Sequence, residues 1–550
     1  MLDADQQRAV DSDARRLGVI AGAGTGKTRV LTHRAARVCE LAGAHRVLCV
    51  TFTRKAAGEM RERLDAMDIV APEIRTLHAW AATVLRGHAH EIGRTSKFRV
   101  YDEVDSLDLL RLCAVEWYPT SGNERRESML RDDRVRRLYL RRLKEADAVD
   151  FDGLEMLALT LAEKGAFRGM YDHVLVDEAQ DLSRNQAKIL AWMNPDNLCM
   201  VGDPRQSIYR FRGAVPSIFQ NYLDADTTTR VNLTTNYRSR VRIVDAANTV
   251  VTNRWGLMDA SRDDDPFDVE LHVGHEPRIV LDRVVALDVA GTPLSDIAVL
   301  GRTWRELDDV RTALEREGVP HTYYGGASDV WSEPNARRLA RVLAMVDQPS
   351  DDNMSALSVN WGRTRIEGSQ LRLMWSRVTE ERRSLLALAA ETSPAMDRLR
   401  RLVMAPPDEF VDDVGALAAE ILTIVLGRVP DNMVELVTSL AGQSLEDWRA
   451  WWTGGRLEDD PKNNERGEGV QLMTIHAGKG LEWPVVIGLG CMAGAFPPRT
   501  KNIDEREESC RLLYVLVTRA CDRLILTRPD LWRNRPTEWS PFLADVLGAE

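Results

Sequence analysis

Short apolar runs that end in polar residues recur along the chain of 550 residues. The clearest are "LGVIAGAG", "RVLCVTFT", "HVLVDEAQD", "LCMVGD", "DIAVLGRT" and "EWPVVIGLG", at residues 17–24, 46–53, 173–181, 198–203, 296–303 and 482–490. Continuous apolar runs of this kind, without polar alternation, are typical of strands that are buried on both faces of a parallel sheet.

Helical patterns lie between these predicted strands. Examples are "KTRVLTHRAARVCELA" (27–42) and "RKAAGEMRERLDAM" (54–67), in which apolar residues recur at helical spacing. Because strands and helices alternate, the pattern predicts an α/β fold with a doubly wound sheet. In such folds, ligands bind beyond the carboxyl ends of the strands.

Two stretches interrupt this alternation. Residues 88–166 are charged and helical in pattern, and residues 351–464 are helical and rich in Trp, Leu and Arg. Both are predicted to be helical insertions in the α/β scaffold. The segment "RDDRVRRLYLRRLKE" (131–145) fits two interpretations equally well, a surface for the phosphates of duplex DNA or a solvated amphipathic helix.

Composition and charge narrow the class of protein. The chain has 44% hydrophobic and 29% charged residues, a composition typical of a globular protein. Its formal net charge is −11, so a site for nucleic acid would have to be a local basic groove rather than the surface as a whole. We find no run of the roughly 18 apolar residues that a membrane span needs, and no secretory signal at the N-terminus. The cysteines are scattered without C-x-x-C spacing, which predicts neither disulfides nor a zinc or iron–sulfur site and favours the cytoplasm.

A glycine-rich turn separates the first predicted strand from the first long helix, in "VIAGAGTGKT" (19–28). Backbone N–H groups of such a turn bind anionic oxygens, helped by the helix N-terminus. We expect Lys27 to reach the outer phosphates of a nucleotide and the Thr28 hydroxyl to bind Mg²⁺. The usual pattern begins with glycine, and Ala21 stands there instead. A turn without a nucleotide is the alternative.

An acidic pair follows a second buried strand, in "HVLVDEAQD". Asp177 and Glu178 lie side by side at the strand end, where one carboxylate can hold Mg²⁺ while its neighbour polarises an attacking water. Alone, the pair would fit an exposed acidic turn. Together with the phosphate loop it predicts ATP hydrolysis.

The segment "GDPRQSIYRFRGA" (202–214) crowds an acid, a glutamine, two aromatics and three arginines together. Its density is unlike a core element and too irregular for an ordinary solvated face. With this segment included, the chain resembles the superfamily 1 DNA helicases of the UvrD/Rep/PcrA family. The resemblance rests on stretches in family order, namely "LDADQQRAV", "AGAGTGKT", "TFTRKAAGEM", "TLHAW", "VDEAQD", "GDPRQSIYRFRGA", "NYRS", "VQLMTIHAGKGLEWPVV" and "YVLVTRA".

The resemblance implies two RecA-like P-loop motor domains, each with a mainly helical insertion. The first motor domain would comprise residues 1–87 and 167–237, with 88–166 as its insertion. The second would comprise residues 238–350 and 465–550, with 351–464 as a reduced insertion.

The resemblance also implies the nucleotide site. It assigns the phosphate loop to Ala21, Gly22, Ala23, Gly24, Thr25, Gly26, Lys27, Thr28 and Arg29. Gln6 is similar to the residue that reads adenine, Tyr237 to the one that stacks on the base, and Glu482 to the one that touches the ribose.

The catalytic residues are implied in the same way. Asp177 completes the Mg²⁺ site with Thr28, and Glu178 is the base. Gln206 resembles the sensor of the γ-phosphate. Arg238 and Arg519 resemble two arginine fingers supplied by the second motor domain, so hydrolysis would be coupled to closure and opening of the cleft.

The DNA track is implied by aromatic and polar residues. Tyr209, Phe211 and Arg212 would link the γ-phosphate to the bases, since stacking grips any sequence. Phe52, Thr76 and His78 are further candidates, and Trp532 lies near the place of a strand-splitting aromatic. A buried aromatic cluster is the alternative for Phe211 and Tyr209.

The chain departs from the family pattern in several places. The second insertion is short, Pro498 stands where histidine is common, and Ser509 and Cys510 replace the usual Glu and Arg. We therefore keep three hypotheses. The first is a 3′-to-5′ DNA helicase or single-strand translocase in repair, recombination or replication. The second is a DNA-stimulated ATPase subunit of a recombination or anti-phage complex, with little unwinding alone. The third is a catalytically inactive DNA-binding scaffold.

The partners expected from the first hypothesis are ATP, Mg²⁺, single-stranded DNA and single/double-strand junctions. We expect no membrane association. We also expect a protein partner that loads or activates the motor, and a monomeric or weakly oligomeric state. The expected location is the cytoplasm of a bacterial or phage-infected cell, in association with the nucleoid.

Overall fold

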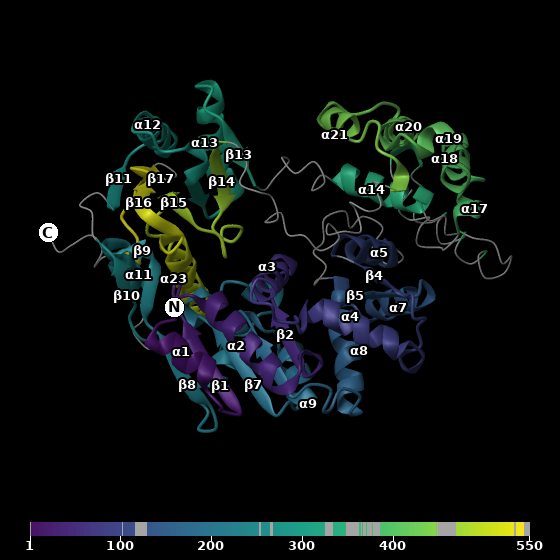
Figure 1. Cartoon of the computed structure of the whole chain (residues 1–550). Coiled ribbons are helices and arrows are strands. Elements are labelled where there is room, and N and C mark those ends of the chain that lie inside the picture. Colours follow the sequence, from purple (N-terminus) through teal and green to yellow (C-terminus); the bar gives the residue numbers. More distant parts are fainter. Residues whose placement is uncertain are drawn as a thin grey trace. The chain divides into compact units, whose positions relative to one another are not determined.

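The predicted strands gather into two parallel sheets in the computed structural model of the chain (Figure 1). The structure describes residues 2–101, 103–115, 129–251, 255–263, 268–324, 334–347, 362–364, 366, 370, 374, 377, 385–446, 448, 469–532 and 535–543. One compact unit comprises Met1–Ala81, Ala158–Gly326 and Pro461–Glu550, and a second comprises Ala82–Leu157 and Ala327–Asp460. Both sheets lie in the first unit, which confirms the α/β class.

The first sheet has six strands, paired in parallel. Their order is β3 (Glu73–Thr76), β2 (Val47–Thr51), β6 (His173–Val176), β7 (Asn197–Gly202), β1 (Arg16–Ala21) and β8 (Thr229–Leu233). Helices α1 (Ala4–Asp11), α2 (Lys27–Ala42) and α3 (Arg54–Asp65) contribute to the core on one face, and α9 (Arg184–Met193) and α10 (Pro216–Asp224) complete this half. Every residue of β2 is buried, which explains its continuous apolar run.

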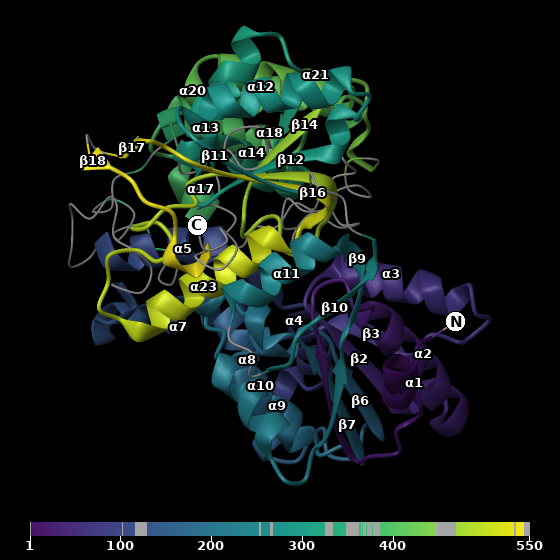
Figure 2. The same ribbon diagram turned by 90° about the vertical axis from the view of Figure 1, so that its left-hand side faces the viewer.

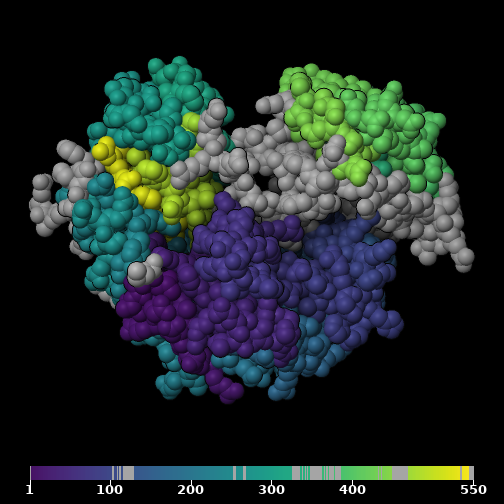
Figure 3. Space-filling view, viewed as in Figure 1, coloured from purple at the N-terminus to yellow at the C-terminus, as the bar shows by residue number. Residues whose placement is uncertain are grey.

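The second sheet also has six parallel strands. Their order is β11 (Val269–Val273), β16 (Ala520–Arg528), β15 (Trp483–Gly488), β12 (Ile297–Gly301), β14 (Val470–Thr474) and β13 (His321–Tyr323). Segments far apart in the sequence build this half, so its surface is teal and yellow in Figure 3.

Helices cover both faces of the second sheet, as Figure 2 shows. Ile297 and Val299 of β12 pack with α12 (Glu276–Val289) and α13 (Trp304–Arg316), whereas Ala298 and Leu300 pack with α11 (Val241–Val250) and α23 (Ile503–Val517). The alternation along one strand defines a doubly wound sheet. In the same half, β9 (Thr235–Arg240) pairs in parallel with β10 (Asp259–Arg262), and β17 (Leu531–Trp532) pairs with β18 (Arg535–Pro536).

The second compact unit contains two hydrophobic clusters. One joins α5 (Glu103–Val115), α7 (Asp133–Glu145) and the short strands β4 (Arg99–Tyr101) and β5 (Ala148–Asp150). The other joins α14 (Pro334–Asp347), α17 (Leu385–Ala389), α18 (Pro394–Met404), α20 (Val414–Leu426) and α21 (Val434–Ser439). Of the predicted second insertion, the residues outside the described part of the chain are 351–361, 365, 367–369, 371–373, 375–376, 378–384, 447 and 449–464.

Helix α7 is amphipathic. It buries Val135, Leu138, Tyr139 and Leu143, while its arginines form ion pairs with acids next to them in the sequence, such as Arg136 with Asp133 at 2.6 Å. Such pairs reduce the charge that α7 can present to a phosphate backbone.

Helices α4 (Leu77–Gly87) and α8 (Phe151–Glu163) contain the points where the chain passes between the two compact units, near residues 81–82 and 157–158. Within the described residues, none of the helices combines the length and apolarity that crossing a bilayer requires.

Candidate functional site

The glycine-rich loop connects β1 to α2 at the carboxyl edge of the first sheet. Gly24 and Gly26 have φ values of +73° and +82°, which favour glycine. The Thr25 hydroxyl donates a hydrogen bond to the Gly22 carbonyl at 2.9 Å. A Cβ at Gly26 would lie 2.6 Å from Nε2 of Gln6, so the loop and the Gln6 side chain are in close contact. The predicted loop residues 21–29 are thus continuous in space, with Arg29 exposed on the first turn of α2.

Gln6 and Tyr237 lie beside this loop. Gln6 is buried, and its Nε2 donates to the Thr25 carbonyl at 3.1 Å. Tyr237 is 45% exposed, and its hydroxyl donates to Asp3 at 2.6 Å, while its backbone N–H donates to the Gly24 carbonyl at 2.9 Å. The two predicted adenine contacts therefore come together at one end of the loop.

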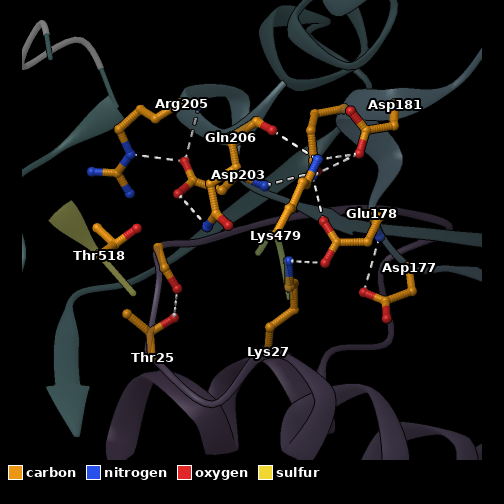
Figure 4. A network of polar contacts seen from close by, with 12 residues as sticks. Thr25, Lys27, Asp177, Glu178, Asp181, Asp203, Arg205, Gln206, Lys479 and Thr518 are labelled. Atoms are coloured by element: carbon orange, nitrogen blue, oxygen red, sulfur yellow. Dashed lines mark hydrogen bonds and ion pairs between the residues drawn. The ribbon is translucent and has the colours of Figure 1, made fainter. Parts of the chain in front are cut away.

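Lys27 connects the loop to the acidic pair. Its Nζ lies 2.6 Å from Oε1 of Glu178, which follows β6 (Figure 4). Glu178 has a φ of +50°, a left-handed conformation that is rare outside glycine and costs on the order of 1–3 kcal/mol. The Asp177 carboxylate accepts a hydrogen bond from the Glu178 backbone N–H at 2.9 Å.

Burial and charge move the pKa values of these groups in opposite directions. Burial raises the pKa of Asp177 to about 6, and the charge of Glu178 adds to the effect. Burial alone would also raise the pKa of Glu178, but the charges of Lys27 and Lys479 outweigh it and lower that pKa to about 2. Two adjacent carboxylates in different electrostatic environments are typical of an acid–base site.

A buried network leads from the acidic pair to Gln206. The Gln180 amide donates to Glu178, and its Oε1 accepts from the Asp203 backbone N–H at 3.0 Å. The Asp203 carboxylate accepts from Nε2 of Gln206 at 2.9 Å and from Nε of Arg205 at 2.8 Å. These contacts fix the orientation of Gln206 behind the phosphate loop (Figure 4).

Lys479, from the segment after β14, enters this network from the second half of the unit. Its Nζ forms an ion pair with Asp181 and donates to the Gln206 carbonyl at 2.7 Å. It also lies 4.6 Å from the centroid of the Tyr209 ring. Burial raises the pKa of Asp181 to about 6, although the charge of Lys479 opposes that rise.

The two predicted arginine fingers lie close to Gln206 and to each other. Nη2 of Arg519 is 3.5 Å from Oε1 of Gln206, and burial, followed by the charge of Arg238, lowers the Arg519 pKa to about 10. Arg238 forms an ion pair with Glu482 at 2.5 Å. Its Nε is buried and has no acceptor, so a phosphate oxygen would supply a missing partner.

The predicted DNA track is an aromatic cluster. The rings of Phe52 and Tyr209 stack with centroids 5.2 Å apart and an interplanar angle of 11°. Tyr209 is 3% exposed, whereas Phe211 is 61% exposed and meets the His476 ring edge-on. The Arg212 guanidinium lies over both Tyr209 and Phe211.

Thr76 and His78 lie one strand away from this cluster. Thr76 ends β3 and caps α4 by accepting a hydrogen bond from the Ala79 backbone N–H at 3.2 Å. His78 is partly buried on the first turn of α4. Phe52 follows β2, which pairs with β3 in the sheet. All three residues thus lie at the carboxyl ends of neighbouring strands.

Sequence reasoning assigned no role to several central residues, namely Gln180, Asp181, Asp203, His476, Lys479 and Tyr514. Lys479 and His476 belong to "TIHAGKGLEWP", and Gln180 and Asp181 to "VDEAQD". Their position within these segments was the only feature of the sequence that could have indicated a role for them. Their partners lie up to 311 positions away, as for Tyr514, whose hydroxyl donates to the Asp203 carboxylate at 3.2 Å, so only the fold identifies them.

A phosphate loop, an acidic pair and two parallel six-stranded sheets within one compact unit define the class of P-loop nucleotide hydrolases with two motor domains. Residues 2–128 and 119–226 match the UvrD/REP helicase N-terminal domain, and residues 231–374 and 455–529 match the UvrD-like helicase C-terminal domain. The chain belongs to the UvrD-like helicase family.

Curated relatives match nearly the whole chain. ATP-dependent DNA helicase UvrD1 of Mycobacterium tuberculosis (strain ATCC 25618 / H37Rv) is 30% identical over 637 residues, covering 96% of this chain and 82% of the relative. ATP-dependent DNA helicase PcrA of Bacillus subtilis is 28% identical and is covered to 85%, with 98% of this chain aligned. DNA helicase II of Escherichia coli K12 is also 28% identical, with 97% of this chain and 85% of the relative aligned.

Proposed function

We propose that this chain is an ATP-dependent DNA helicase that moves 3′ to 5′ along a single strand and separates the duplex ahead of it. The observation that carries the proposal is that two arginines from outside the first sheet lie beside the nucleotide site. A Cβ at Gly24 would lie 2.6 Å from Cβ of Arg238, and Nη2 of Arg519 lies 3.5 Å from Oε1 of Gln206. Lys27 and Glu178 belong to the first sheet's half, whereas Arg238 and Arg519 lie next to strands of the second.

The chemistry follows from the positions of these groups. Lys27 and the loop N–H groups bind the outer phosphates, and Glu178 orients a water and accepts its proton. Gln206 and the two arginines stabilise charge on the transferring phosphoryl group. Because the arginines come from the second half, they reach the phosphates only when the two halves close, which couples hydrolysis to movement.

Mg²⁺ would be held by the Thr28 hydroxyl and the Asp177 carboxylate, together with phosphate oxygens. The residues fit this ion, since both offer hard oxygen ligands and the buried Asp177, with its raised pKa, would gain a compensating cation. Among the described residues, no group of three or more His, Cys, Asp or Glu side chains is suited to a metal ion. When bound, Mg²⁺ neutralises charge that develops on the phosphates.

The DNA contacts follow from the aromatic cluster. Phe211 offers an exposed ring, and Phe52 and Tyr209 offer rings that DNA bases can reach once their mutual stack opens. Thr76, His78 and Arg212 lie beside them. Trp532, 46% exposed on the β17–β18 hairpin, is our candidate for the wedge that splits base pairs. We propose single-stranded DNA and single/double-strand junctions as substrates, acted on in the cytoplasm, where the seven free cysteines stay reduced.

The test is ATP hydrolysis by the purified full chain with and without single-stranded DNA, together with unwinding of 3′- and 5′-tailed duplexes. We expect hydrolysis to rise with DNA and unwinding to favour the 3′ tail. Lys27→Ala should abolish hydrolysis but retain DNA binding without ATP.

Other results of this experiment would contradict parts of the proposal. Unwinding from the 5′ tail would refute the polarity. Stimulated hydrolysis without unwinding would favour a motor subunit that needs a partner, and wild-type hydrolysis no higher than that of Lys27→Ala would favour an inactive scaffold.

A further inference from the structure

Arg262, the last residue of β10, contacts the backbone of the first arginine finger. Its Nη1 donates to the Arg238 carbonyl at 2.6 Å, and its Nη2 lies 2.5 Å from Oδ1 of Asp522. The same Nη1 lies 3.4 Å from the Cys521 carbonyl. One guanidinium thus joins the strand that carries Arg238 to the residues that directly follow Arg519.

Further contacts join the same two segments. The Ser239 hydroxyl donates to the Ala520 carbonyl at 2.7 Å, and Nη1 of Arg238 lies 3.3 Å from the Thr518 carbonyl. Arg240 lies 3.4 Å from Oδ1 of Asp522. The C-terminal half of β9 is therefore attached to the segment 518–522.

The N-terminal half of β9 is attached elsewhere. Nδ2 of Asn236 donates to the Ala23 carbonyl at 2.8 Å, and the Tyr237 N–H donates to the Gly24 carbonyl. Residues 236 and 237 of the strand thus contact the phosphate loop, whereas residue 239 contacts the half of the unit that contains the second sheet. Arg238 lies between the two sets of contacts: its backbone N–H donates to Oδ1 of Asn236 at 2.8 Å, and its carbonyl accepts from Arg262.

We propose that Arg262 and Asp522 are positioning residues that hold the Arg238 backbone in register with Arg519, so that both fingers move as one body. The proposal rests on the proposed function, because it assigns a part in hydrolysis to residues outside the predicted nucleotide and DNA sites. The Arg262 side chain is 35% exposed and that of Asp522 is 38% exposed, too open for a purely structural core pair. A planar guanidinium can donate to two acceptors at once, which a lysine ammonium does with poorer geometry.

The experiment compares single-stranded-DNA-stimulated ATP hydrolysis in the full-length wild type, Arg262→Met, Arg262→Lys and Asp522→Asn. For Arg262→Met we expect kcat to fall about tenfold to hundredfold, the effect of a misplaced catalytic group, with KM for ATP within about twofold of wild type. Arg262→Lys should recover only part of the loss. Asp522→Asn should lower kcat in the same direction, but less.

A double-mutant cycle shows whether Arg262 acts through Arg238. In the Arg238→Ala background, Arg262→Met should change kcat by less than about twofold, because its target is gone. The matched control is Arg311→Met, since Arg311 is 41% exposed and pairs with Glu315 at 3.4 Å within α13 of the same half. It should leave kcat unchanged.

The outcomes separate this proposal from the proposed function. Wild type without stimulated hydrolysis would refute the proposed function. A stimulated wild type that loses activity in Arg238→Ala, but not in Arg262→Met or Asp522→Asn, would overturn the positioning role alone. If Arg262→Met does not fold, an unchanged kcat in Asp522→Asn overturns the role by itself. A loss of the same size in both backgrounds also overturns it, because the effect would not pass through Arg238.

Discussion

Lys479→Met removes the charge that joins Asp181 to the segment 202–214. The Lys479 Nζ contacts the Asp181 carboxylate, the Gln206 carbonyl at 2.7 Å and the Tyr209 ring at 4.6 Å. The Lys479 side chain is 5% exposed and that of Asp181 is not exposed. Methionine keeps much of the length and volume of lysine, so the change isolates the ammonium group.

The expected cost follows from the partner that is left behind. Removing one member of a buried ion pair leaves an uncompensated charge and costs about 3–5 kcal/mol of unfolding free energy. The pKa of Asp181, already about 6, should rise further without Lys479. An acid whose pKa is raised in the folded state loses stability as pH rises from its unfolded value of 3.8 through the folded pKa. The variant should therefore lose more stability at pH 8 than at pH 5.

Urea unfolding at both pH values measures this loss. The double variant Lys479→Met/Asp181→Asn is the matched control, because removing both charges restores most of the stability. It should still show little DNA stimulation of ATP hydrolysis, since the contact between Gln206 and Tyr209 through Lys479 is missing. A cost below about 1 kcal/mol, or a double variant no more stable than the single one, would refute the electrostatic argument.

Three further substitutions test separate parts of the site. Arg519→Ala should lower kcat by about 10³-fold or more while KM for ATP changes little, because the contact strengthens in the transition state; an effect confined to KM would contradict the finger assignment. Tyr209→Ala should retain basal ATP hydrolysis and lose its stimulation by single-stranded DNA, so an equal loss of both would argue against a role in coupling. Trp532→Ala should slow the unwinding of a 3′-tailed duplex at unchanged DNA-stimulated hydrolysis; unaltered unwinding would exclude Trp532 as the wedge.

Six inner strands could be predicted from sequence, whereas the inner strands β14 and β16 and the edge strands could not. "RVLCVTFT" and "EWPVVIGLG" form β2 and β15, because strands buried on both faces need continuous apolar residues. Edge strand β8 reads "TRVNL" and is half exposed, so it has no such run. Strand β14 is fully buried but contains Gln471, whose amide donates to the Gly469 carbonyl. A buried polar residue with a local hydrogen-bond partner interrupts the apolar run by which a central strand would be predicted.

Some residues of the site could likewise be predicted from sequence, and others could not. Residues that are neighbours in sequence, such as the phosphate loop or Asp177 and Glu178, were predictable because one local turn sets their geometry. The burial of Tyr209, one of two alternatives left open by the sequence, could not be decided there, because it depends on Phe52 and Lys479 from distant segments. The family resemblance predicts that Tyr209 stacks on a base, yet it is Phe211 that presents an exposed ring.

The central claim is that ATP is hydrolysed between two motor halves, with arginines of the second completing a site built on the first. The most direct measurement is an experimental structure of the full chain with single-stranded DNA and the transition-state mimic ADP–aluminium fluoride. We expect the guanidinium groups of Arg238 and Arg519 to lie within about 3 Å of the fluorides that replace the oxygens of the transferring phosphoryl group. Arg238 should no longer pair with Glu482. Either guanidinium directed away from the mimic in the closed form would contradict this claim.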